Sequence, residues 1–315
     1  MAATIVLLVS VPAAPVLADP AGPTDYRSEV ASIEPPAPGI HVEMIGGDSF
    51  LQITVDPGTA LDVIGYRGEP YLRFEPDGTV EINDNAPSTY LSEDRYGETA
   101  VPDSATPDAE PDWRVVGTDG VYAWHDHRSH WMNESRPAAE PGDQILEAVV
   151  PVVVDGVDTD VTIISTWVRA PSPLPAAAGA LIGALIAFSL GRNDGRTAKL
   201  VLAFLAVAAS VVSVWAYTSV PPETAPSYVP VVGAVAALGL TGYGLLRSHV
   251  DQTIAVMAPA LILAGWGFIR RAWLTRAILP TSIPTTDRFV TALVLVAATI
   301  IVLAGVSRLA RLNRV

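Results

Sequence analysis

The pattern of apolar and polar residues divides the chain into two parts. From Ile40 to Arg169, short apolar runs tend to alternate with polar positions and are separated by turn residues, a pattern typical of strands with one buried face. Beyond residue 173, the apolar runs become long and nearly free of charge. The first pattern predicts β structure, and the second predicts helices that span a membrane.

The candidate strands of the first part follow one another without an intervening helical period. They cover residues 40–45, 49–55, 60–66, 71–75, 79–83, 113–116, 121–127, 145–154 and 160–169. Because a parallel sheet needs helical crossovers between its strands, we predict an all-β antiparallel sandwich over residues 40–169. The proline-rich segments 19–39 and 170–175 are predicted to be linkers.

The second part predicts an α-helical membrane domain of five spans over residues 174–308, followed by a tail at 309–315. The spans cover residues 174–190, 199–218, 229–246, 252–269 and 289–306. Acidic residues, histidine and lysine are missing from the middle of each predicted span, which argues against a proton pump or a small-solute transporter. Gly179 and Gly183 form a small-xxx-small pattern that favours close helix packing.

Residues 1–18 have the features of a signal peptide. Their apolar stretch is too short for a bilayer, which takes about 20 residues, and it ends in Val16-Leu17-Ala18. Export would place residues 19–173 outside the cytoplasmic (plasma) membrane, and five spans would return the carboxyl terminus to the cytoplasm. Seven basic residues then fall inside and four outside, which agrees with the positive-inside rule; the outer four are Arg270, Arg271, Arg276 and Arg288.

Composition narrows the function further. Residues 19–172 hold 29 of the 33 acidic residues and only 8 arginines, a net charge of −21, whereas residues 173–315 carry a net charge of +7. The acidic part disfavours binding to nucleic acid or to an anionic membrane surface and fits a cationic partner better. The chain has no cysteine, which excludes a disulfide scaffold, a thiol nucleophile and thiolate metal sites.

One cluster carries the candidate chemistry. His125, His127 and His130 lie within six residues, between two tryptophans, and Met132 follows them. Neutral imidazole is the commonest metal ligand, and a thioether adds a preference for Cu(I). We therefore predict a metal site, copper first, at these four residues, with His41, Met44 and Asp126 as further candidate ligands.

Strand geometry sets a condition on this site. Side chains two apart on a strand share a face, so His125 and His127 can reach one ion. His130 and Met132 have the opposite parity, and they can join only if the chain turns near Arg128 and Ser129. The alternative interpretation is a buried polar network in which the same histidines stabilise the fold.

Several blocks of sequence carry a resemblance to a known family. They are Gly65–Phe74, Pro87–Tyr90, Asp94–Gly97 and the W-H-D-H-R-x-H-W-M motif at Trp124–Met132. The chain resembles a family of actinobacterial exported membrane proteins with an extracellular β domain. This resemblance implies a loose association with copper handling.

The expected function is a non-catalytic, membrane-anchored extracellular protein that binds a metal ion. A Ser/His/Asp hydrolase built on Ser129 or Ser135 is disfavoured, because no Gly-x-Ser-x-Gly motif accompanies these residues. The alternatives are an interaction module of the cell envelope with a protein partner and, second, a small-solute transporter. The expected partners are a metal ion, the lipid bilayer and an envelope protein.

Overall fold

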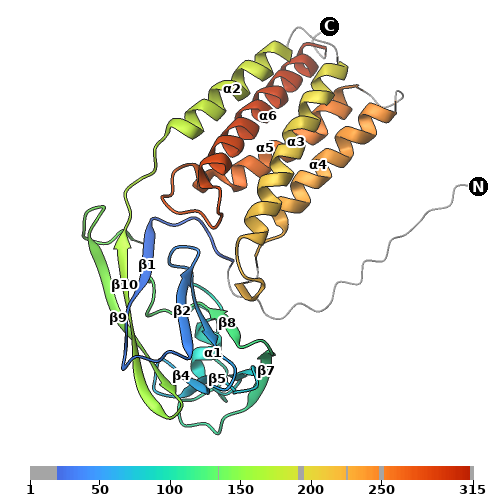
Figure 1. Cartoon of the computed structure of the whole chain (residues 1–315). Helices are drawn as coiled ribbons and strands as arrows, with labels where there is room; N and C mark the ends of the chain where they lie inside the picture. The colour runs from blue at the N-terminus through green and yellow to red at the C-terminus, as the bar shows by residue number, and fades with distance from the viewer. Residues whose placement is uncertain (1–19, 134, 191–194, 225, 248–251, 313–315) are drawn as a thin grey trace, which may run out of the picture.

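The computed structural model describes residues 20–133, 135–190, 195–224, 226–247 and 252–312. For Glu223 and residues 308–312 it describes the backbone alone. The predicted signal peptide lies outside these residues. The chain forms a β part followed by a helical part, and the two meet at one end of the helices (Figure 1). We call them the β domain and the helical bundle.

Seven strands form the larger antiparallel sheet of the β domain, in the order β1-β10-β9-β4-β5-β6-β7. Their bounds are Tyr26–Glu34 (β1), Leu61–Ile64 (β4), Pro70–Phe74 (β5), Val80–Asn83 (β6), Trp113–Gly117 (β7), Gln144–Val154 (β9) and Val157–Trp167 (β10). The long β9–β10 hairpin closes through Asp155 and Gly156, both at positive φ (50° and 79°), as a tight two-residue turn requires.

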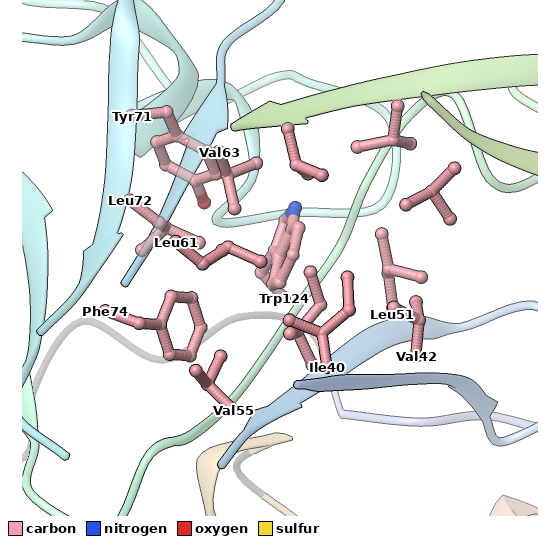
Figure 2. Packing of buried hydrophobic residues seen from close by; sticks show 14 of the residues in the cluster. Ile40, Val42, Leu51, Val55, Leu61, Val63, Tyr71, Leu72, Phe74 and Trp124 are labelled. Carbon is pink, nitrogen blue, oxygen red and sulfur yellow. The ribbon is translucent and has the colours of Figure 1, made fainter. Parts of the chain in front are cut away.

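A second antiparallel sheet contains three strands in the order β2-β3-β8. Their bounds are Ile40–Ile45 (β2), Phe50–Val55 (β3) and Val121–Trp124 (β8), and a short helix, α1 (Pro87–Leu91), lies outside both sheets. Side chains from the two sheets enter one hydrophobic core, in which Trp124 packs among residues such as Leu51, Leu61 and Phe74 (Figure 2). The predicted antiparallel β structure is therefore confirmed.

Two predicted boundaries need correction. Residues 26–34 were expected in a linker, but they form β1, an edge strand that pairs with β10 from Tyr26↔Trp167 to Glu34↔Asp160. The sequence does not indicate this strand, because its side chains are exposed or half-buried except for one buried residue, the polar Ser28. The predicted strand 121–127 ends at Trp124, since the chain turns directly afterwards.

The helical part contains five apolar helices. They are α2 (Leu174–Leu190), α3 (Gly195–Thr218), α4 (Val229–Leu246), α5 (Gln252–Ile269) and α6 (Pro284–Leu312), with short 3-10 turns η1 (Pro222–Thr224) and η2 (Arg271–Leu274) between them. Among the described residues, α3 to α6 are long and apolar enough to cross a membrane, and α2 is a shorter apolar helix of 17 residues. The helices thus indicate a membrane protein.

The small-residue pattern of α2 marks its contact with α6, alongside which it runs in Figure 1. A Cβ atom placed on Gly179 would overlap the carbonyl oxygen of Phe289, and one on Gly183 would lie 2.5 Å from that of Leu293. Only glycine allows the two backbones to approach this closely.

The two parts are connected by more than the chain at residues 168–173. The segment before β1 pairs with the loop between α5 and α6, since Thr24 N donates to Ile278 O (3.0 Å) and Ile278 N donates to Thr24 O (2.9 Å). Asp25 accepts hydrogen bonds from Arg276 Nη1 (2.6 Å) and Ala277 N (2.9 Å). Residues 20–25, expected in a linker, therefore dock the β domain onto the bundle.

Candidate functional site

The histidine cluster lies on the turn that follows β8. Ser129 N donates to Asp126 O (2.8 Å), and Arg128 N donates to the Asp126 carboxylate (3.0 Å). The chain therefore turns near Arg128 and Ser129, which was the condition for His130 to lie beside His125 and His127. This turn brings His125, His127 and His130 together, with ring centroids of His130 6.2 Å from His125 and 5.6 Å from His127.

Asp126 is engaged by its neighbours within the same turn. Its buried carboxylate accepts hydrogen bonds from Trp124 Nε1 (3.0 Å) and from Arg128 Nε (2.9 Å) and Nη2 (2.7 Å). Burial alone would raise the pKa of Asp126, but the Arg128 guanidinium and these hydrogen bonds hold it below its ordinary value. The carboxylate therefore acts as the counter-ion of Arg128 and fixes the turn.

The first two imidazoles are each held by a backbone carbonyl and an aromatic ring. His125 is buried, donates from Nδ1 to Ser49 O (2.5 Å) and stacks on Phe50 at a centroid distance of 4.1 Å. His127 donates from Nε2 to Asp94 O (3.1 Å) and stacks on Tyr66 at 5.2 Å. These contacts fix the position of both rings, as a structural network would.

His130 occupies a different environment. Its ring is buried and edge-on to the other two imidazoles, Nδ1 lies 3.5 Å from Trp131 O, and Nε2 has no hydrogen-bond partner among the described residues. Burial first, and then the positive charge of Arg95, lower the pKa of His130 to about 3. The ring is therefore neutral at physiological pH.

The remaining predicted ligands, His41, Met44 and Met132, lie in other surroundings. His41 is exposed on β2 and pairs with Thr54, which pairs with Val121 at the start of β8. Met44 packs against the hydrophobic core, and Met132 is 36% exposed. Among the residues that the structure describes, no three His, Asp or Glu side chains form a group that could hold a metal ion.

A cavity of about 430 Å³ lies between the β domain and the bundle, and His125 forms part of its wall. We call it the junction cavity. Three arginines of different origin line it: Arg95 from the loop after α1, Arg136 from the segment before β9, and Arg276 from the α5–α6 loop. The other lining residues are Pro20, residues 22–26, Ser49, Tyr96, Trp131 and Asn133.

Two of these arginines are paired with carboxylates. Arg95 Nη2 lies 2.5 Å from Asp48 Oδ2, and Arg276 pairs with Asp25. Burial raises the pKa of Asp48, although Arg95 opposes this shift. Arg136 is exposed, and no described carboxylate lies within ion-pair distance of it. The lining of the cavity therefore carries an excess of positive charge.

A second hollow continues this basic region. It is lined by Asp25, Arg136, Arg271 and Arg276, together with Ile269, Ala272 and Thr275. Arg271 is exposed and lies over the Phe268 ring at 4.5 Å, and its guanidinium makes no ion pair with a described carboxylate. The basic side chains of this hollow thus come from both parts, Arg136 from the β domain and Arg271 and Arg276 from the connection between α5 and α6.

The sequence did not indicate a site at these arginines. The available signal was the group of basic residues on the predicted outer side of the bundle, which weakened the positive-inside count. Arg95 and Arg136 gave no such signal, because they are isolated in sequence and meet only in the fold. No protein family matches the chain, and no curated protein or solved structure is similar to it.

Proposed function

We propose that this chain is a multi-pass protein of the cytoplasmic membrane that holds a β-sandwich on the outer side and binds an anionic ligand in the junction cavity, without catalysing a reaction. The single observation that carries the proposal is the convergence of Arg95, Arg136 and Arg276 on one cavity. Guanidinium groups bind phosphate and carboxylate groups through paired N–H donors, so these anions are the expected ligand chemistry.

The orientation rests on the sequence and on the helices. A signal peptide at residues 1–18 would export the β domain, and the 17 residues of α2 lie at the lower end of the range for a span. With α2 counted, five spans place the carboxyl terminus in the cytoplasm. The junction cavity then lies at the outer surface of the membrane.

The absence of catalysis is part of the proposal, and one contact supports it. A serine nucleophile needs a base within hydrogen-bond reach. Ser129 Oγ instead donates to Asp126 O (2.7 Å), within its own turn. His125 and His127 are held by the carbonyls of Ser49 and Asp94.

Thermal unfolding of the full chain in a neutral detergent tests the proposal, with inorganic phosphate as the probe and chloride at equal ionic strength as the reference. Phosphate is expected to raise Tm in a concentration-dependent manner, because a ligand that binds the folded state stabilises it. Arg136→Gln is expected to weaken the apparent affinity for phosphate about tenfold, because the variant loses the binding free energy of one charge-assisted hydrogen bond.

Arg67→Gln is the matched control, because Arg67 is also an exposed arginine of the β domain and lines neither basic hollow. It should respond to phosphate as the unmodified chain does. Equal phosphate effects in Arg136→Gln and the unmodified chain, or no effect in either, would overturn the proposal.

Metal binding is the second candidate function, and one observation favours it. Each of the three imidazoles has one ring nitrogen directed at a backbone carbonyl, which is how metal-ligating histidines are usually oriented. Copper binding should then raise Tm of the full chain and of His41→Gln, but not of His127→Gln. Identical Cu(II) responses in the two variants would exclude the histidine cluster as the site.

A further inference from the structure

A mainly apolar groove of about 340 Å³ lies next to the junction cavity, at the end of the bundle that faces the β domain. The two share Pro20, Gly22 and Pro23 as a common wall. The other walls come from the ends of α3 and α4 and from the α5–α6 loop, including Ala216, Tyr217, Val220, Val229, Pro230, Ile269, Trp273 and Pro280. The basic cavity and the apolar groove thus adjoin each other along residues 20–23.

The one charged side chain among the described lining residues of the groove is already neutralised. Arg270 is buried, pairs with Asp287 Oδ1 (2.5 Å) and stacks against Trp273 at 3.6 Å. The groove therefore offers apolar surface to a ligand, and the unpaired positive charge lies outside it, at Arg136 and Arg271. A ligand that uses both regions must carry an anionic end and an apolar end.

The groove also opens where lipid is expected. Val229 and Ile269 line it and remain 52% and 58% exposed, as side chains that face acyl chains would be. Trp215 and Tyr217 lie at the same end of α3, and aromatic residues of this kind are enriched at membrane–water interfaces. In the proposed orientation, this end of the bundle lies at the level of the outer headgroups.

We propose that the junction binds one anionic phospholipid, with its phosphate at Arg136, Arg271 and Arg276 and an acyl chain in the apolar groove. This inference rests on the proposed function, because it identifies the anionic ligand of the same basic region. A lipid fits better than a soluble anion, since only a lipid also covers the exposed apolar walls. The positive charges favour an acidic headgroup over a zwitterionic one.

The test uses the full chain, purified in a mild detergent and incubated with mixed micelles that contain equal amounts of phosphatidylglycerol and phosphatidylcholine. Lipid retained by the protein is quantified by native mass spectrometry. Phosphatidylglycerol should be retained preferentially, and Arg136→Gln and Arg271→Gln should each reduce its retention about fivefold, the effect of roughly 1 kcal/mol for one arginine near an anionic lipid.

A matched pair of variants tests the groove. Val229 and Val232 are both exposed on α4, but only Val229 lines the groove. Val229→Trp fills the groove and should reduce phosphatidylglycerol retention, whereas Val232→Trp should leave it unchanged. Both variants should keep the Tm response to inorganic phosphate, because the basic region is intact.

The outcomes separate the two proposals. Equal retention of both lipids, or equal retention by Val229→Trp and Val232→Trp, would overturn the lipid proposal. If the phosphate response that depends on Arg136 persists in that case, the cavity binds a soluble anion and the proposed function stands. If the phosphate response is missing as well, both proposals fail.

Discussion

His130 shows how one side chain couples the stability of the β domain to pH. The ring is buried among two imidazoles and near Arg95, so a proton on it would be both desolvated and repelled. The pKa of His130 is lowered from 6.5 to about 3 in the folded chain. Between these values the unfolded chain binds a proton that the folded chain does not, so stability must fall as the pH falls from 6.5 toward 3.

The resulting prediction concerns His130→Phe, which keeps an aromatic ring in the same position. The free energy of unfolding of the full chain is expected to fall by as much as about 1.4 kcal/mol per pH unit between pH 6.5 and 5 because of His130, and this part of the slope should disappear in the variant. Chemical unfolding in detergent at several pH values measures the slope.

His41→Phe serves as the control, since His41 is exposed on β2. Its pH slope should equal that of the unmodified chain. If His130→Phe keeps the full slope between pH 6.5 and 5, the destabilisation has another origin and the description of His130 is wrong.

The clustering of the three histidines could be predicted from the sequence, but the groups that hydrogen-bond to them could not. The three histidines and the turn after them follow from local spacing and parity. The groups that hold two of these rings, Ser49 O and Asp94 O, belong to distant loops and are backbone atoms. Every residue has a carbonyl, so no sequence pattern marks these two as partners.

At the scale of elements, the helices could be predicted from the sequence and β1 could not, because the two kinds of element depend differently on their neighbours. Long apolar runs specify a helix in lipid almost without tertiary context. An edge strand is specified by its neighbour, and β1 offers polar and part-exposed residues between prolines. Its buried Ser28 donates to Ser129 O (2.5 Å), so this strand also anchors the histidine turn.

The close contact between α2 and α6 predicts that one methyl group added at Gly179 lowers the stability of the chain. Gly179→Ala is expected to destabilise the full chain by about 1–3 kcal/mol, because the added Cβ overlaps the α6 backbone and overpacking forces the helices apart. Gly239→Ala on α4 is the control, since no described atom outside its own stretch of helix lies within 4 Å of its added Cβ. Thermal unfolding in detergent compares the two, and equal Tm values would show that α2 does not pack on α6 as described.

At the scale of the whole molecule, the relative position of the two parts decides whether the junction cavity exists. The sequence predicted both parts and assigned the segment between residue 19 and β2 to a linker, because a proline-rich composition is common to extended linkers and to extended segments that dock. What makes residues 20–25 dock is their complement on the α5–α6 loop, the Arg276 side chain and the Ile278 backbone. Such pairing between segments some 250 residues apart has no local signature.

Asp25 provides the test of this docking. Its carboxylate is the partner of both Arg276 Nη1 and Ala277 N, so Asp25→Asn should loosen the junction, and one charge-assisted contact of this kind contributes about 1.5–3 kcal/mol.

The chain has no cysteine, so Asp119→Cys on the β domain and Val232→Cys on α4 can carry a specific spin-label pair. The distance distribution should be narrow in the otherwise unmodified chain and broad with Asp25→Asn, while Asp155→Asn, at the far hairpin, should leave it narrow. A narrow distribution that Asp25→Asn does not change would mean that other contacts set the geometry of the cavity.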